Sequence, residues 1–122
     1  MSDDLVGYDV AEHVAVLTLQ SPKNLNALSD AMLAALRAAL MRAGDDGQVR
    51  AVVIRGTGKA FCAGHDLKEM QAGRTAPDKG AAYFADLFGR CAGVMQMIPA
   101  LPQPVIAQVP GIATAAGGQL VA

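Results

Sequence analysis

Residues 49–66 of the chain read VRAVVIRGTGKAFCAGHD. The first part holds the continuous apolar run Ala51–Ile54, which is typical of a parallel strand buried on both faces. A glycine-rich loop follows it directly. Ligand sites in α/β proteins lie at the carboxyl ends of such strands, so this stretch predicts both an α/β fold and a candidate binding loop.

Upstream of this stretch the chain predicts two strands and a helix. Residues 5–20 favour a strand pair with a turn at 11–13, because β-branched residues flank polar ones. Ser29 is a suitable N-cap, with Asp30 in the first turn, and Gly44 is expected to end the helix as a C-cap. The apolar residues between them recur at three- and four-residue steps, as they do in an amphipathic helix.

Downstream, the pattern repeats. Residues 72–79 predict a mobile surface loop, and 81–98 predict a second helix that Pro99, Pro102 and Pro104 end. One face of this helix is expected to carry Phe84, Leu87, Phe88, Cys91, Val94, Met95 and Ile98. Residues 105–109 then predict another buried strand. Strands that alternate with helices in this way require right-handed crossovers in a largely parallel sheet.

Composition limits the classes of protein to which the chain can belong. The 122 residues carry 10 Lys and Arg against 11 Asp and Glu, and this balance argues against a nucleic-acid-binding surface. A hydrophobic content of 52% with 17% charged residues is too apolar for a disordered chain, and it predicts an apolar surface that meets a partner. No stretch approaches the roughly 20 apolar residues of a membrane span. Cys62 and Cys91 form no CxxC motif and, without a leader, predict reduced thiols in a cytoplasmic protein.

Two phosphate-binding motifs are tested and rejected. Gly58-Lys59 resembles the end of a Walker A loop, but Ala60 replaces the required Ser or Thr. A dinucleotide fingerprint fails because Phe61 stands where its third glycine belongs. The loops suit backbone amide donors better, since small residues let amides approach a ligand closely and two converging amides form an oxyanion hole. From spacing alone, tight turns explain the glycines equally well.

Four segments in order carry a resemblance to a known family. Residues 61–70, FCAGHDLKEM, resemble the FxAGxDxKEM stretch of the enoyl-CoA hydratase/isomerase superfamily, the crotonases. Residues 22–28, 49–56 and 104–118 resemble three further family segments. The resemblance implies an α/β crotonase (ClpP-like) spiral of ββα units. Because family members are far longer, residues 1–122 are expected to be the N-terminal part of a single crotonase domain.

The resemblance also implies the site. The family's oxyanion hole falls on the backbone amides of His65 and Ala116, with the imidazole of His65 as an alternative acid or base. The first of two water-positioning glutamates falls on Gln119. The coenzyme A cleft would be lined mainly by main chain. One wall falls on Cys62, Ala63, Asp66 and Leu67, and the other wall falls on Lys23, Leu25 and Ala27. Cys62 is interpreted as a small core residue, and Lys68 and Glu69 as a solvated helix face.

Departures from the family pattern bear on the reaction. Glutamine at 119 can hydrogen-bond water but is not a useful base. Ala115 and Ala116 replace glycines, and the second glutamate would lie beyond Ala122. Residues 65–69 and 115–122 together resemble one particular branch of the family.

The sequence therefore favours an acyl-CoA-processing protein, nominally a lyase that adds water to 2-enoyl-CoA in lipid and fatty acid metabolism. The alternatives are a coenzyme A thioester isomerase or hydrolase, or an acyl-CoA-binding protein that has lost its catalytic carboxylates. The expected partner is an acyl-CoA or enoyl-CoA thioester. The expected assembly is a homotrimer or a hexamer built as a dimer of trimers. No metal, no cofactor beyond the coenzyme A of the substrate, and no nucleic acid or membrane partner is expected.

Overall fold

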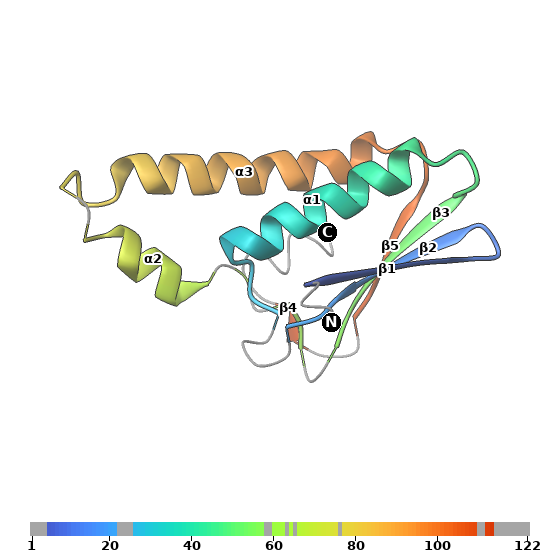
Figure 1. Ribbon diagram of the computed structural model, residues 1–122, viewed down its shortest axis with the longest axis horizontal. Coiled ribbons are helices and arrows are strands. Elements are labelled where there is room, and N and C mark those ends of the chain that lie inside the picture. The colour runs from blue at the N-terminus through green and yellow to red at the C-terminus, as the bar shows by residue number, and fades with distance from the viewer. Residues whose placement is uncertain are drawn as a thin grey trace.

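The computed structural model describes residues 5–21, 26–57, 60–62, 64, 66–75, 77–109 and 112–113. Its main sheet has the strand order β1-β2-β3-β5, and β4 and β6 form a separate two-stranded sheet. The strands are β1 (Val6–Ala11), β2 (Val14–Leu19), β3 (Ala51–Gly56), β4 (Ala60–Cys62), β5 (Val105–Gln108) and β6 (Ile112–Ala113). The helices are α1 (Asp30–Asp45), α2 (Leu67–Gly73) and α3 (Ala81–Ala100). Figure 1 shows α1 and α3 side by side, with α1 next to the main sheet.

The first hairpin forms where the sequence predicts it. β1 pairs with β2 in antiparallel register, and Ala11 lies opposite Val14. The two residues between them, Glu12 and His13, have φ angles of 52° and 69°, as a tight hairpin turn requires. The turn is held further because the amide of Arg50 donates to the carbonyl of His13 at 2.7 Å.

The predicted parallel crossovers are confirmed. β2 pairs with β3, and β3 pairs with β5, both in parallel register. α1 connects the first pair, and α2 and α3 connect the second. The core lies between the sheet and the helices. Its largest fully buried side chains are Leu17, Leu19, Leu28, Met32, Leu33, Leu36, Leu40, Val52, Ile54, Leu87 and Val94.

The expectation that β3 is buried on both faces is wrong for the part of the chain that the structure describes. Val52 and Ile54 are buried on the helix side, whereas Val53 is half-buried and Arg55 is exposed. Ile106 of β5, which pairs with Val53, is 54% exposed. An apolar run thus indicates a buried strand without saying whether the same part of the chain covers both faces.

Both predicted helices form, but two boundaries differ. Gly44 lies inside α1, and Asp46 is the C-cap. A Cβ at residue 44 would lie 2.6 Å from Cδ2 of Leu101, so the glycine serves close packing and does not end the helix. Pro99 lies in the last turn of α3, and Leu101 is the C-cap. Proline has no amide hydrogen to donate. The helix still closes after it, because the amide of Leu101 donates to the carbonyls of Met97 and Ile98.

The predicted apolar face of α3 is buried only in part. Leu87, Cys91 and Val94 are buried, while Phe88 is 49% exposed. The segment expected to be a loop around residue 72 begins as the end of α2. The short strand β4 also forms inside the stretch expected to be loop, by pairing with β6 far along the sequence. Within the described residues, no helix is both long and apolar enough to cross a membrane.

Candidate functional site

Two segments that are 36 residues apart in sequence lie side by side at the candidate site. The amide of Leu28 donates to the carbonyl of Gly64 at 2.5 Å, and the amide of Asp66 donates to the carbonyl of Leu28 at 3.4 Å. Ala27 therefore lies beside the Gly64–Asp66 turn, and its side chain is buried. This bridge brings together one residue from each of the two sets that the sequence analysis assigns to opposite walls of a cleft.

Gly64 turns the chain from β4 toward α2. Its φ angle is +89°, in the region where a residue with a Cβ is strained. The residue is also buried, and its carbonyl is taken by Leu28. A glycine at this place is thus required by backbone conformation, and the carbonyl bond holds the turn against the start of α1.

Asp66 is the N-cap of α2. Its Oδ1 accepts from the amides of Lys68 at 3.0 Å and Glu69 at 3.2 Å. These bonds satisfy donors that a helix start leaves unpaired. Oδ1 of the carboxylate is therefore engaged within its own turn, and the amide of Asp66 is engaged by the carbonyl of Leu28.

Cys62 is buried beneath this turn with no exposed surface. Burial raises the pKa of its thiol, and a weaker opposing effect comes from a hydrogen bond with the backbone of Gly64. A thiol with a raised pKa is protonated at neutral pH and is a poor nucleophile. The interpretation of Cys62 as a small core residue is confirmed. Cys91 is likewise a free, buried cysteine.

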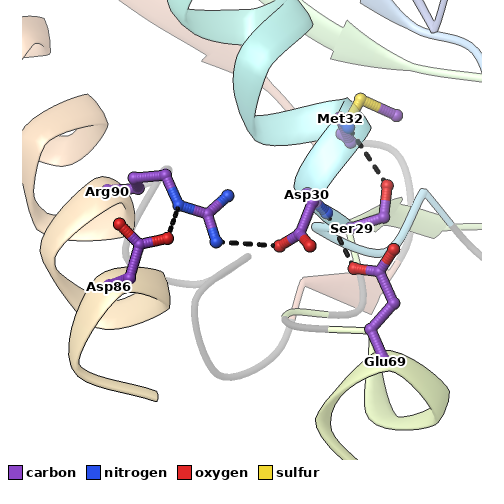
Figure 2. A network of polar contacts seen from close by, with 6 residues as sticks. All are labelled: Ser29, Asp30, Met32, Glu69, Asp86 and Arg90. Atoms are coloured by element: carbon purple, nitrogen blue, oxygen red, sulfur yellow. Dashed lines mark hydrogen bonds and ion pairs between the residues drawn. The ribbon is translucent and has the colours of Figure 1, made fainter. Parts of the chain in front are cut away.

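A network of polar contacts joins the three helices near this turn (Figure 2). Oε1 of Glu69, on α2, accepts from the amide of Asp30 at the start of α1 at 2.7 Å. Arg90 reaches from α3 to the carboxylate of Asp30 at 3.0 Å and to that of Asp86 at 2.8 Å. Ser29 caps α1 as predicted, since its Oγ accepts from the amide of Met32 at 3.1 Å.

The expectation of a solvated helix face at Lys68 and Glu69 is right for Lys68 and wrong for Glu69. Lys68 is exposed, whereas Glu69 is half-buried against the first turn of α1. A carboxylate is favoured there because the N-terminus of a helix carries a positive potential. No pattern near Glu69 in the sequence signals this contact, because its partner lies 39 residues away.

Tyr83 of α3 lies close to the same network. Burial raises the pKa of its phenol, and the negative charges of Asp30 and Glu69 raise it further. Its hydroxyl oxygen is buried without a hydrogen-bond partner among the described residues. The hydrogen bond to Asp30 raises the pKa of the Arg90 guanidinium, so Arg90 stays a cation.

Sequence reasoning missed one residue of this region, Asn26. It is the buried polar residue of the described core, with no exposed surface. Its Oδ1 accepts from the amide of Ser21 at 2.7 Å, and its Nδ2 donates to the carbonyl of Thr57 at 2.9 Å. The available signal was its place between a strand and a helix, where asparagine often hydrogen-bonds its own turn.

A groove of about 670 Å³ lies elsewhere, between α1 and α3. Of the predicted site residues that the structure describes, none lines this groove. Its lining residues are Leu33, Ala34, Arg37, Ala38, Met41, Ala85, Asp86, Gly89, Arg90, Gly93 and Val94. The described residues include no group of three or more His, Cys, Asp or Glu side chains that could hold a metal ion.

Comparison with known proteins identifies the family. The family model described as enoyl-CoA hydratase/isomerase matches residues 9–122. The chain belongs to this family. Its crotonase fold is supported by the crystal structure of an enoyl-CoA hydratase from Mycobacterium smegmatis, which is 55% identical with a TM-score of 0.87 and matches 95% of this chain and 44% of that one. An enoyl-CoA hydratase/isomerase family protein from Silicibacter pomeroyi is 46% identical with a TM-score of 0.85, over 96% of this chain and 48% of that one.

The branch indicated by residues 65–69 and 115–122 is also represented. The mitochondrial enoyl-CoA hydratase domain-containing protein 3 of Homo sapiens is 42% identical over 106 residues, which are 87% of this chain and 33% of the human protein. The chain thus spans between a third and a half of the length of these relatives. The human relative's name places that protein in mitochondria, whereas the sequence analysis predicts a cytoplasmic location here.

The structure describes four of the predicted site residues. Ala27, Cys62, Asp66 and the backbone of Leu67 are within the described residues and gather around the Gly64 turn. The other predicted residues lie outside the described ones; they are Lys23, Leu25, Ala63, His65, Ala116 and Gln119.

Proposed function

We propose that the protein processes acyl-CoA thioesters as an enoyl-CoA hydratase, adding water to a 2-enoyl-CoA while an oxyanion hole holds the thioester enolate. The observation that carries this proposal is the hydrogen-bonded bridge between Leu28 and the Gly64–Asp66 turn. It joins the two segments that resemble the walls of the family's coenzyme A cleft. Membership in the enoyl-CoA hydratase/isomerase family supports the same reaction class.

Each predicted residue has a role in the proposed reaction. The backbone amides of His65 and Ala116 donate to the thioester oxygen, where negative charge develops as the enolate forms. Gln119 orients the water. Main chain at the two walls binds the coenzyme A, and the residues concerned are Lys23, Leu25, Ala27, Cys62, Ala63, Asp66 and Leu67. The coenzyme A arrives as part of the substrate, and the active assembly is a homotrimer or hexamer.

The oxyanion hole is tested with a thioester and its ether analogue. The ether keeps the coenzyme A and the chain but lacks the carbonyl, so the full-length protein should bind it more weakly. Ala116→Pro removes one amide donor, and the loss of one such donor typically lowers a catalysed rate about 10²–10³-fold. The same variant should lose the preference for the thioester. Equal affinities of the unaltered protein for both compounds would contradict the hole.

The role of Gln119 is tested by the rate of crotonyl-CoA hydration, followed as loss of enoyl-thioester absorbance. Glutamine supplies no base, and general acid–base groups contribute roughly 10²–10⁴ in rate, so the unaltered protein should be slow. Gln119→Glu should raise the rate if a carboxylate occupies the second, downstream position. An unaltered protein as fast as an ordinary hydratase, or a Gln119→Glu variant slower than it despite that carboxylate, would show that the role is misassigned.

Gln119 also favours a second candidate function. A protein that keeps the cleft while an amide replaces a catalytic carboxylate is suited to binding acyl-CoA without turning it over; an isomerase or hydrolase with its base downstream is a further variant. The identity of the residue at the second glutamate position separates these functions. A carboxylate there favours an enzyme, whereas an apolar or small residue favours a binding protein.

A further inference from the structure

Asn26 occupies an unusual position for a polar residue. It has no exposed surface, and its φ angle of 55° lies in the left-handed region that asparagine tolerates better than most residues. A buried amide side chain is retained only where its donor and acceptor are both satisfied. The partners of its side chain therefore indicate what the residue holds in place.

Two of those partners, Ser21 and Thr57, tie Asn26 to the ends of two strands. The amide of Asn26 donates to the carbonyl of Ser21 at 2.8 Å, and the amide of Ser21 donates to Oδ1 of Asn26 at 2.7 Å. This pair of bonds ties Asn26 to Ser21, two residues after the end of β2. The Nδ2 group donates to the carbonyl of Thr57 at 2.9 Å, at the end of β3.

The anchor point is itself rigid. The amide and the hydroxyl of Thr57 both donate to the carbonyl of Leu19, at 2.9 and 3.0 Å, which ties the end of β3 to the end of β2. On its other side Asn26 leads directly into Ala27 and Leu28, where the bridge to Gly64 forms. Asn26 thus lies between the strand ends and the bridge.

We propose that Asn26 is a positioning residue for coenzyme A binding: its side-chain amide fixes the backbone at Ala27 and Leu28, which the bridge joins to Gly64 and Asp66. The proposal rests on the proposed function, because that function assigns Ala27 and Asp66 to opposite walls of the cleft. One planar amide supplies the acceptor for Ser21 and the donor for Thr57 together. Aspartate keeps the acceptor and places a second acceptor against the Thr57 carbonyl.

Two variants and a matched control test the role in the full-length protein. Asn26→Asp removes the donor to Thr57 and keeps the residue's tolerance of positive φ. Asn26→Gly removes the whole side chain without backbone strain. Gln103→Ala is the control, because Nε2 of Gln103 likewise bridges two backbone carbonyls, those of Ala43 at 2.9 Å and Val49 at 3.1 Å. Those carbonyls lie near the start of β3, at the end opposite to Thr57.

The measurement is the dissociation constant for coenzyme A, compared with that for an acyl-N-acetylcysteamine thioester, which keeps the thioester but lacks the nucleotide. Both Asn26 variants should bind coenzyme A about tenfold more weakly, as expected for a loss of roughly one buried hydrogen bond. Their affinity for the short thioester should stay within about twofold of that of the unaltered protein. This change is well below the roughly tenfold loss expected for coenzyme A. Gln103→Ala should change neither affinity.

The outcomes distinguish failure of the proposed function from failure of the positioning role of Asn26. If the unaltered protein does not bind coenzyme A, the proposed function fails and this inference fails with it. If it binds, and the folded Asn26 variants bind equally well, only the positioning role is overturned. An equal loss for both ligands, or unfolding of both Asn26 variants while Gln103→Ala stays folded, would assign Asn26 a general structural role and also overturn the proposal.

Discussion

Glu69 connects the candidate site to the start of α1 through a single contact with the amide of Asp30. The nearby ion pairs of Arg90 contribute less, because their side chains are between 36% and 67% exposed and such pairs are worth about 0–1 kcal/mol. The capping contact is half-buried and satisfies a helix-end donor. The stability of this junction therefore depends on the carboxylate of Glu69 more than on the salt bridges.

Glu69→Ala should lower the free energy of unfolding by about 1 kcal/mol, the usual cost of losing a helix cap. Glu69→Gln should have a smaller effect, because the amide oxygen can still accept the bond without the charge. Lys68→Ala is the control, since this neighbour is exposed and should stay within about 0.5 kcal/mol. Urea unfolding measures all three. Equal effects of the Glu69 and Lys68 variants would mean that the contact does not stabilise the fold.

Cys62 gives stability a pH dependence with a definite sign. Burial raises the pKa of its thiol in the folded state. Below the ordinary thiol pKa of about 8.5 the thiol is protonated in both the folded and the unfolded chain, and stability is at its full value. Above that pH the unfolded chain loses the proton first, and stability falls until the folded-state pKa is passed. The unfolding free energy should therefore decline as the pH rises above about 8.5.

The Cys62→Ala variant tests this pH dependence independently of its own packing cost. The slope of stability against pH, and not the absolute value, should become shallower in the variant. Cys91→Ala is the comparison variant, because burial also raises the pKa of its thiol. It should make the slope shallower in the same direction. An unchanged slope in Cys62→Ala would show that this thiol does not govern the alkaline limb.

At the scale of elements, the glycines of α3 and α2 differ in what surrounds them. A Cβ at Gly89 of α3 would meet nothing within 4 Å, whereas one at Gly73 of α2 would collide with the ring of Tyr83. Glycine inside a helix is less favourable than alanine by roughly 0.5–1 kcal/mol. The same substitution should therefore have opposite signs in the two helices.

Gly89→Ala should raise the free energy of unfolding by about 0.5–1 kcal/mol, and Gly73→Ala should lower it. Thermal unfolding of both variants in parallel gives the comparison. A loss of stability in Gly89→Ala would mean that another surface packs into the groove between α1 and α3.

At the scale of the whole molecule, one face of the main sheet stays open in the described part of the chain. Val16 and Val53 pair on this face and are half-buried, and Ile106 beside them is 54% exposed. β5 is also an edge strand of the described sheet. Unpaired edges and apolar faces of this kind promote association.

The 122-residue chain expressed by itself should therefore self-associate. Sedimentation velocity should show species larger than a monomer, and Ile106→Lys should reduce them by placing a charge on the open face. An exposed alanine substitution such as Lys68→Ala, far from this face, should leave the distribution unchanged. A monomeric profile together with a cooperative thermal transition would contradict the prediction.

The sequence by itself determined the order of the main elements and the family to which the chain belongs. Alternating apolar patterns, the turn at Glu12 and His13, and the Ser29 cap are local signals, so the hairpin and α1 follow from neighbouring residues alone. The motif of residues 61–70 likewise predicts the family that the comparisons show. These features depend on residues that are close together in sequence, so a local pattern is enough to predict them.

Only the tertiary structure decided how distant segments meet. The bridge from Leu28 to Gly64, the cap that Glu69 provides for Asp30, and the tie from Asn26 to Thr57 each join residues 31 to 39 apart. The close approach of Leu101 to Gly44, a residue that lies inside α1, also joins segments far apart in sequence. Such contacts form where the packed sheet and helices bring distant ends of the chain together. No local pattern of side chains predicts which ends these are.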